Sequence, residues 1–288
     1  MPYVTTRDKT RLYVKDWGSG PPVVLLHGWP LNADTWDGVA LELAEAGFRA
    51  IAYDRRGFGR SDQPWNGYDY DTLADDLAAV MAETGAIDAT LVGFSMGGGE
   101  VARYMSRHEG KGVARSVLIG SVVPHMTKSA DNPEGVEGET FAKMAAAIRE
   151  DRAHFFRGFF KDFYGVGMIA RPVSAEVLDW SLAMALQAGL RPTLAAADAF
   201  ARTDFRADLA SFQVPTLFLH GTADKTVPID ATSRVAAARV TGAEFIEYDG
   251  GPHGLLATHP GEIATDLLAF LGRPVEVSSG MVPGTTVI

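Results

Sequence analysis

The stretch Ile87–Gly99 most constrains the fold, because it joins an apolar run to a helical pattern through a serine flanked by glycines. Within it, Gly93–Gly97 reads Gly-Phe-Ser-Met-Gly and matches Gly-x-Ser-x-Gly, the pattern of a serine on a sharp strand-to-helix turn. Glycines two residues before and two after Ser95 are expected where backbone segments approach closely and a Cβ atom would clash. Thr90–Val92 predicts a buried strand, and Glu100–Arg107 predicts a helix whose amino end faces the serine. The stretch therefore predicts that Ser95 is a nucleophile.

Composition and charge limit the classes of function that this chain can have. Its 288 residues suit one large α/β domain, or one domain with an insertion. A formal net charge of -10, without a visible basic patch, argues against nucleic acid or an anionic membrane as a partner. Because the sequence contains no cysteine, disulfides, thiol catalysis and thiolate metal sites are excluded. Met1–Asp8 has no apolar core of signal-peptide type and no apolar run reaches membrane-spanning length, so we expect a cytoplasmic protein.

Alternating strand and helix patterns predict a mostly parallel sheet of eight strands flanked by helices. The expected strands are Tyr3–Thr5, Arg11–Trp17, Val23–His27, Phe48–Tyr53, the run before Ser95, Ala114–Gly120, Val214–His220 and Ala243–Tyr248. The first two alternate apolar and polar residues and predict an antiparallel hairpin. The expected flanking helices are Asp34–Ala46, Asp71–Thr84, Glu100–Arg107, Pro228–Val240 and Thr265–Leu271.

The alternation stops between Ser121 and about Phe212, where no strand-like run occurs. Four helical patterns fill this part of the chain: Glu139–Asp151, Arg152–Tyr164, Ser174–Leu190 and Pro192–Ala201. Helices inserted between two strands would lie as a cap over one edge of the sheet. We therefore predict a core of residues 1–120 and 213–272, a helical cap of residues 121–212 after the sixth strand, and a flexible C-terminal extension of residues 273–288.

A nucleophilic serine needs a base, and the base needs an acid that orients it. Of seven histidines, His253 alone lies in a glycine-flanked loop after the last strand. Asp224 lies just past a strand end, whereas Asp230 begins a helix and Asp249 lies beside its own strand end. The predicted triad is therefore Ser95, Asp224 and His253, in the chain order that this type of turn requires.

Two further histidines, His27 and His220, each precede a glycine at the end of a predicted strand. A histidine in this place commonly forms a hydrogen bond to a neighbouring loop. We expect both side chains to be structural.

A serine nucleophile also needs two backbone N–H donors placed where the negative charge of the tetrahedral intermediate develops. Met96 follows the nucleophile directly and is the first expected donor. Trp29 lies in the loop after an early strand and is the second. Pro30 has no N–H, so we expect it to shape that loop and to leave the Trp29 carbonyl directed at the pocket.

These motifs resemble the α/β-hydrolase superfamily over roughly Tyr3–Leu271. Within that superfamily the chain is similar to the cofactor-free bacterial haloperoxidases, or perhydrolases, with their aryl esterase and γ-lactamase relatives. The strings that carry the resemblance are His27–Pro30, Asp54–Ser61, Gly93–Gly99, Phe163–Gly165 and Pro252–Gly254. The resemblance implies an α/β-hydrolase fold with the helical cap after strand 6, and it does not extend to the residues after Arg273.

The resemblance also implies an activity. It is the hydrolysis of small carboxylic esters through an acyl-Ser95 intermediate, without a cofactor or metal. When hydrogen peroxide replaces water, the same intermediate would give a peracid, which oxidises halide in solution. Pro30 after Trp29 is typical of the members that perform this perhydrolysis.

The acyl pocket can be assigned only through the resemblance. Phe159, Phe163, Thr226 and Val227 resemble positions that line this pocket in relatives, together with Pro30. A pocket walled by phenylalanines suits small aryl or short-chain acyl esters. The implied partners are thus a small ester and water or hydrogen peroxide. Whether the chain forms a homo-oligomer stays open.

Other functions on the same fold need comparison with this one. Haloalkane dehalogenases and epoxide hydrolases share the fold but use an aspartate nucleophile, which Ser95 disfavours. A γ-lactam or amide hydrolase would use the same triad and differ in pocket shape alone. A non-catalytic ligand-binding protein on this fold has no need of three intact catalytic positions.

Overall fold

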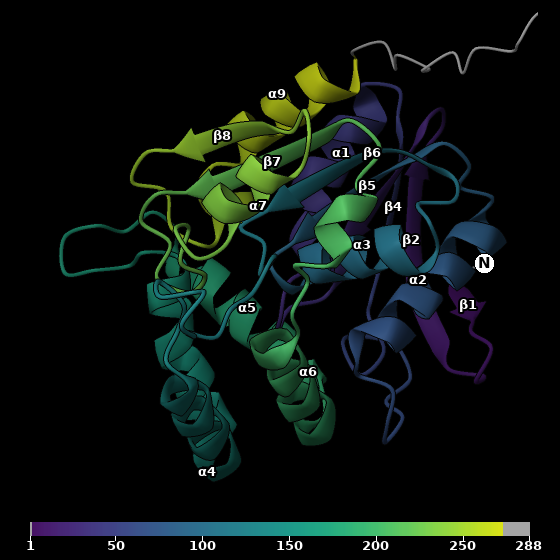
Figure 1. The fold of residues 1–288 in the computed structure, drawn as a ribbon. Helices are drawn as coiled ribbons and strands as arrows, with labels where there is room; N and C mark the ends of the chain where they lie inside the picture. Colours follow the sequence, from purple (N-terminus) through teal and green to yellow (C-terminus); the bar gives the residue numbers. More distant parts are fainter. Residues whose placement is uncertain (1, 273–288) are drawn as a thin grey trace, which may run out of the picture.

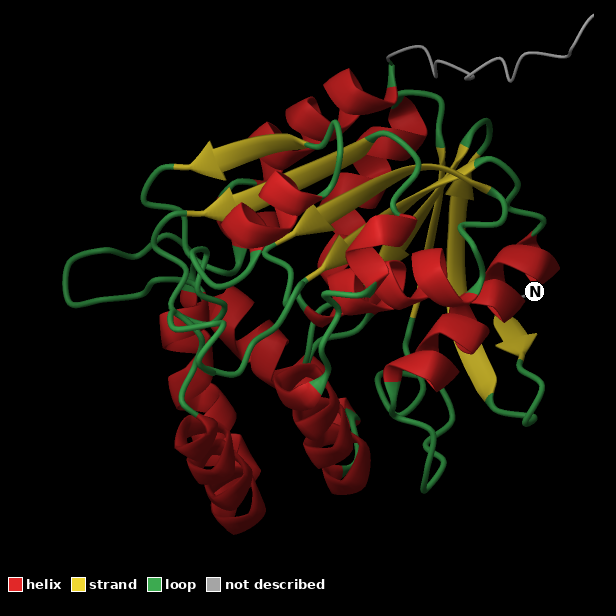
Figure 2. Cartoon of the chain, viewed as in Figure 1, coloured by secondary structure: helices red, strands yellow, loops and turns green. Residues whose placement is uncertain are grey.

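The computed structural model describes residues 2–272, and its strands form a mixed sheet (Figures 1 and 2). Over these residues the strand order is β1-β2-β4-β3-β5-β6-β7-β8. Strand β2 is antiparallel to β1 and β4, and the other pairs are parallel. The strands are β1 (Tyr3–Thr5), β2 (Arg11–Gly18), β3 (Pro22–Leu26), β4 (Arg49–Tyr53), β5 (Ala89–Phe94), β6 (Val113–Ile119), β7 (Thr216–Gly221) and β8 (Glu244–Tyr248). The expected eight-stranded, mostly parallel sheet is confirmed.

Burial explains why the central strands are runs of apolar residues. All six residues of β5 are buried, because helices cover both faces of the sheet there. In β2, near the edge of the sheet, buried and more exposed residues alternate, as expected for a strand with one face toward water. The centre of the sheet is therefore fully packed, and β5 holds the nucleophile turn at its carboxyl end.

Helices pack on both faces of the sheet (Figure 1). Two of them, α1 (Asp37–Glu45) and α9 (Pro260–Leu271), contact each other on one face. On the other face lie α2 (Tyr70–Thr84), α3 (Met96–Arg107) and α7 (Ser233–Arg239). Three short helical segments complete these layers: η1 (Ala33–Trp36), η2 (Asp208–Ser211) and α8 (Leu255–Thr258).

Three helices are inserted between β6 and β7: α4 (Gly138–Phe163), α5 (Ala175–Gln187) and α6 (Leu190–Arg202). They lie together at the side of the sheet to which the carboxyl ends of β6, β7 and β8 point (Figures 1 and 2). The sequence predicts two helices where α4 runs, meeting at Asp151, and the backbone of Asp151 is non-helical there (φ -152°, ψ 92°). Its carboxylate accepts a hydrogen bond from the N–H of His154 at 2.9 Å, which caps the second half of the helix.

Several predicted boundaries differ from the structure by a few residues, and the largest difference between them is at the start of α7. The pattern Pro228–Val240 predicts a helix, but turns closed by the carbonyls of Pro228 and Ile229 come first and α7 begins at Ser233. The predicted closing helix, to which Thr265–Leu271 belongs, is α9; it begins at Pro260, because proline is compatible with the first turn of a helix. The predicted flexible extension, residues 273–288, lies outside the described residues.

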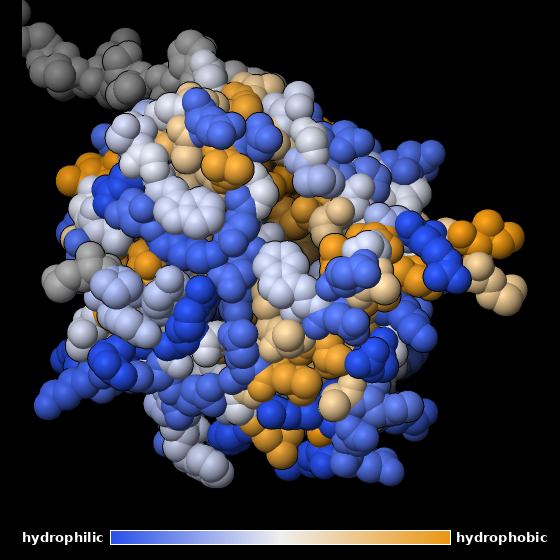
Figure 3. Space-filling model, turned by 180° about the vertical axis from the view of Figure 1, so that it is seen from behind, coloured by the Kyte–Doolittle hydropathy of each residue, from blue (hydrophilic) through white to orange (hydrophobic). Residues whose placement is uncertain are grey.

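The segment between β6 and β7 exposes apolar side chains. Seen from behind, the molecule exposes apolar side chains over the part that the inserted helices form, whereas much of the remaining face is hydrophilic (Figure 3). Among the described residues, Met168 and Ile169 in the loop between α4 and α5 are almost fully exposed.

Candidate active site

The turn after β5 holds Ser95 in a strained backbone conformation, with φ 54° and ψ -117°. A Cβ atom on Gly93 would lie 2.5 Å from the carbonyl oxygen of Gly97, so the two glycines meet across the turn as their spacing predicts. On Gly28, in the neighbouring loop after β3, a Cβ would lie 3.0 Å from the Cβ of Ser95. Glycine at these positions lets three backbone segments converge on the serine.

Ser95, His253 and Asp224 lie in one chain of hydrogen bonds. The Nε2 atom of His253 is 2.9 Å from the Oγ atom of Ser95, and its Nδ1 atom is 2.6 Å from Oδ2 of Asp224. Because the carboxylate can only accept, Nδ1 carries the proton and Nε2 presents its lone pair to the serine hydroxyl. The structure thus brings the three residues of the predicted triad together, in the protonation pattern that a general base requires.

The side chain of Asp224 is fully buried, and hydrogen bonds satisfy both of its oxygens. Oδ1 accepts from the backbone N–H groups of Thr226 and Val227, each at 2.8 Å. Burial by itself raises the pKa of this carboxyl, but the nearby His253 and the hydrogen bonds from His220 and His253 outweigh it and hold the pKa below its ordinary value. Asp224 is therefore an anion under ordinary conditions.

His220 is a second imidazole in contact with Asp224, a contact that the sequence analysis does not predict. Its Nε2 atom lies 3.1 Å from Oδ2 of Asp224 and 3.0 Å from the carbonyl oxygen of Val227. Both neighbours are acceptors, so Nε2 carries a proton, while Nδ1 lies 2.7 Å from the hydroxyl of Ser233. The expected bond to a neighbouring loop is present, and the same nitrogen also reaches the triad carboxylate. The spacing of four residues from Asp224 at a strand end is the one sequence signal for this contact.

The two predicted oxyanion donors lie on different segments beside Ser95. Met96 begins α3, and Trp29 follows Gly28 in the loop after β3, with a cis peptide bond between Trp29 and Pro30. The Trp29 indole donates a hydrogen bond from Nε1 to the carbonyl of Thr193 at 3.0 Å, so helix α6 holds this side chain in place. That the N–H groups of Trp29 and Met96 bind an oxyanion stays a prediction.

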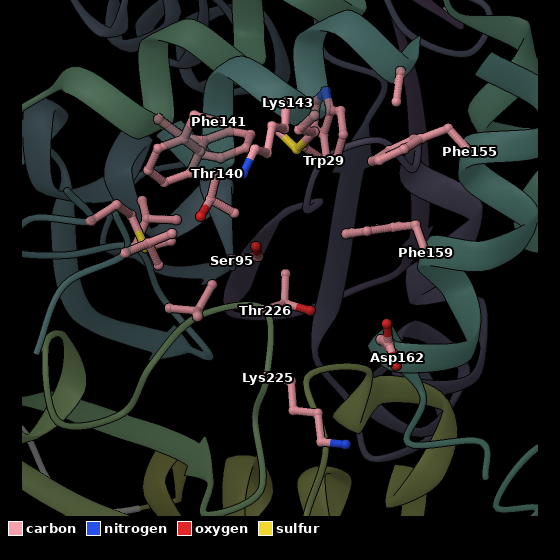
Figure 4. Close-up of a pocket in the computed structure, with 17 residues that line it drawn as sticks. Trp29, Ser95, Thr140, Phe141, Lys143, Phe155, Phe159, Asp162, Lys225 and Thr226 are labelled. Carbon is pink, nitrogen blue, oxygen red and sulfur yellow. The ribbon is translucent and has the colours of Figure 1, made fainter. Parts of the chain in front are cut away.

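A cavity of about 420 Å³ opens above Ser95, and most of its wall is apolar (Figure 4). Figure 4 shows Ser95 at its floor, with Phe155 and Phe159 on one side and Phe141 on the other. The lining residues are Trp29, Ser95, Val122, Met126, Val136, Thr140, Phe141, Lys143, Met144, Ala147, Phe155, Phe159, Asp162, Phe200, Lys225, Thr226 and Val227. Three of the five predicted pocket residues, Phe159, Thr226 and Val227, are among them.

The other two predicted pocket residues, Pro30 and Phe163, are not among the residues that line this cavity. Phe163 ends α4 and is buried, and its ring packs edge-on against the imidazole of His253 with a centroid distance of 4.8 Å. It therefore supports the histidine from the side. In the loop after β3, Trp29 lines the cavity and the following residue, Pro30, does not.

Comparison with known proteins places this site in a family. A family model described as alpha/beta hydrolase fold matches residues 21–260. The chain belongs to the α/β-hydrolase superfamily. It is 43% identical over 281 residues to the non-heme chloroperoxidase CPO-A1 of Kitasatospora aureofaciens, a match that covers 95% of this chain and 100% of the relative.

Two further α/β-hydrolases sharpen the comparison. The chain is 40% identical over 275 residues to the bifunctional esterase/perhydrolase DCH of Acinetobacter calcoaceticus, covering 94% of this chain and 99% of the relative. A crystal structure of bromoperoxidase from Bacillus anthracis aligns with a TM-score of 0.91 and 40% identity, covering 94% of this chain and 99% of that one. The resemblance to the haloperoxidase and perhydrolase group is thereby confirmed.

A buried ion pair beneath the nucleophile helix was not visible in the sequence. Arg55, in the loop after β4, binds the carboxylate of Glu100 in the second turn of α3, and both side chains are buried. Tyr53 donates its hydroxyl to the same carboxylate at 2.9 Å, and the N–H of Arg55 donates to Nε2 of His27 at 3.0 Å. Burial raises the pKa of Glu100 and, together with the charge of Arg55, lowers the pKa of His27. The network ties the carboxyl ends of β3 and β4 to α3, the helix that follows Ser95.

Within residues 2–272, no cluster of three or more His, Cys, Asp or Glu side chains has the arrangement of a metal site. The same residues contain no helix long and apolar enough to cross a membrane.

Proposed function

We propose that this α/β-hydrolase is a serine esterase that cleaves small aryl or short-chain carboxylic esters through an acyl-Ser95 intermediate. We propose further that it forms peracids when hydrogen peroxide takes the place of water. The observation that carries the proposal is the hydrogen-bond chain from Asp224 through His253 to Ser95, at the floor of an apolar cavity.

The first half-reaction follows from the protonation pattern of the triad. His253 accepts the proton of Ser95 at Nε2 while Oγ attacks the ester carbonyl, and the N–H groups of Met96 and Trp29 stabilise the resulting oxyanion. Asp224 stays ionised and stabilises the imidazolium. His253 then returns the proton to the leaving alcohol, which departs and leaves the acyl group on Ser95.

In the second half-reaction, His253 removes a proton from water or from hydrogen peroxide as either one attacks the acyl carbonyl. Water releases the carboxylic acid, and peroxide releases the peracid, while Ser95 recovers its proton from His253. A peracid that diffuses away oxidises halide in solution, so this route to halogenation needs no cofactor. The names of the relatives, which include chloroperoxidase and esterase/perhydrolase, support this second activity.

The cavity wall supports an apolar acyl or aryl group in the substrate. Aromatic rings from the inserted helices and from Trp29 surround the space above Ser95, and the Trp29 ring centroid lies 5.5 Å from those of Phe159 and Phe200. We propose that residues 121–212 act as a cap over a core of residues 1–120 and 213–272. Small aromatic or short aliphatic esters fit such walls better than sugars or strongly charged molecules. Action in the cytoplasm and self-association stay predictions.

A substrate panel tests the proposal. p-Nitrophenyl acetate, phenyl acetate and a bicyclic γ-lactam would be offered, each with and without peroxide plus acetate. We expect turnover of both esters, and peracid formation detected by monochlorodimedone bromination when peroxide, acetate and bromide are present. Lactam turnover without ester turnover would contradict the proposal.

A covalent probe tests the nucleophile directly. Phenylmethylsulfonyl fluoride should add one sulfonyl group to Ser95, seen by mass spectrometry of the peptide that contains it. A label on another residue, with activity lost, would refute the assignment.

A further inference from the structure

A second cavity, of about 220 Å³, lies between α4 and α6 next to the catalytic cavity. Four alanines leave this space open: Ala142 and Ala145 on α4, and Ala197 and Ala201 on α6. Their methyl groups replace the larger side chains that normally fill the space between packed helices. A path therefore runs between the two helices, and it reaches the surface because Ala142 is exposed.

Phe141 and Met144 line both this side cavity and the catalytic cavity, so their side chains form the partition between the two. The ring of Phe141 packs on Phe200 with a centroid distance of 6.2 Å, which holds it in place. Met144 is partly buried, and a methionine side chain adapts easily because it is unbranched and turns about three bonds. Met144 is the part of the partition that can move.

The two ends of the catalytic cavity differ in chemistry. Beyond Phe155 and Phe159, a neighbouring surface hollow includes Glu150, Asp151 and Asp162. On the Phe141 side, Lys143 lines the catalytic cavity and forms an ion pair with Glu139, and the two charged groups of the side cavity, Asp198 and Arg202, form an ion pair with each other. An apolar chain that leaves the catalytic cavity is therefore better accommodated on the Phe141 side.

We propose that the space between α4 and α6 is a binding subsite for the acyl chain of longer linear aliphatic esters, reached when Met144 moves aside. The inference rests on the proposed function, because the chain belongs to the acyl group that Ser95 accepts. The catalytic cavity then holds the ester group and the first carbons, and the alanine-lined path receives the rest of the chain.

A chain-length series tests the subsite. p-Nitrophenyl acetate, butyrate, hexanoate and octanoate would be compared by kcat/KM for the wild type and for Met144→Ala. We expect the octanoate-to-acetate ratio to rise about tenfold or more in Met144→Ala, because one or two methylenes of extra room are worth this much in an apolar pocket.

Two double variants supply the matched control. Ala145→Leu fills the path, whereas Ala146→Leu makes the same change one residue further along the same helix, at an exposed position that lines neither cavity. Combined with Met144→Ala, Ala145→Leu should return the ratio to near the wild-type value, and Ala146→Leu should leave the raised ratio in place.

An equal ratio in the two double variants, or no rise in Met144→Ala, would overturn the subsite. Neither result would affect the proposed function, which is measured by Ser95-dependent turnover of p-nitrophenyl acetate. Absence of that turnover in the wild type would instead refute the proposed function itself.

Discussion

The loops that carry the triad and the helices inserted between β6 and β7 surround the same cavity but are stabilised in different ways. Hydrogen bonds fix the triad: Asp224 has partners on both oxygens, and His253 has one on each nitrogen. The inserted helices contribute rings and methyl groups, such as Phe155 and Phe159, which stack with a centroid distance of 5.8 Å. Hydrogen bonds are directional and apolar contacts are not.

Because of this difference, we expect the two regions to control different kinetic properties. A shift of about 1 Å would misplace the groups in the chain from Asp224 to Ser95, so that region determines the rate of the chemical step. The inserted helices can repack around different substrates, so they determine which ester binds. We therefore expect substitutions near the sheet to act mainly on kcat, and substitutions on α4 and α6 to act mainly on KM.

The largest effect is expected from Ser95→Ala, which removes the nucleophile. Ester turnover should fall by roughly 10⁴ or more, because the members of a triad act as a unit. The rate with p-nitrophenyl acetate measures this, and Ser129→Ala, in the loop before α4, is the matched control. Near-normal turnover in Ser95→Ala would remove the proposed mechanism.

Asp224→Asn tests the electrostatic part of the triad. We expect kcat to fall by on the order of 10³ to 10⁴, because an amide favours the wrong tautomer of His253.

Asp224 should also make the stability of the wild type depend on pH. The folded state lowers the pKa of Asp224, so its contribution to stability is fully present above the ordinary value of 3.8 and decreases as the pH falls below it.

Urea unfolding between pH 3 and pH 7 measures this pH effect. The wild type should lose more of its unfolding free energy on acidification than Asp224→Asn does. Equal losses in the two proteins would show that Asp224 has no lowered pKa in the folded state.

His220→Ala removes the second imidazole from Asp224. We expect kcat to fall about tenfold or more with KM nearly unchanged, since a hydrogen bond to a charged group contributes about 1.5 to 3 kcal/mol. His220→Gln keeps an N–H donor and should recover part of the loss. If both variants lower the melting temperature and leave kcat unchanged, His220 supports the fold alone.

The smallest effect is expected in the cavity wall, where neighbouring phenylalanines give a matched pair. Phe159→Ala should raise KM for phenyl acetate several-fold, because this ring lines the cavity. Phe160→Ala, which removes a fully buried ring outside the cavity, should lower stability by about 3 to 5 kcal/mol. Thermal unfolding and KM, measured on both variants, separate the two roles. A reversed pattern would place Phe160 in the binding wall.

Much of the fold could be predicted from the sequence, because periodic burial leaves a local pattern. The buried strand before Ser95 and the glycines around it were recognisable, and the break at Asp151 matched the kink in α4. The start of α7 at Ser233 was missed, since local turns closed by the carbonyls of Pro228 and Ile229 compete with helix there. Phe163 was assigned to the pocket through the resemblance, but a resemblance in sequence does not say which ring of a helix faces the cavity.

The sequence by itself determined the order of strands and helices and the identity of Ser95, Asp224 and His253 as candidates, because short motifs and periodicity are local properties. Tertiary structure alone decided that His220 touches Asp224, that Arg55 and Glu100 pair beneath α3, and that alanines on α4 and α6 leave a path beside the cavity. These contacts depend on how distant segments pack, and packing is set by the shapes of all the side chains together.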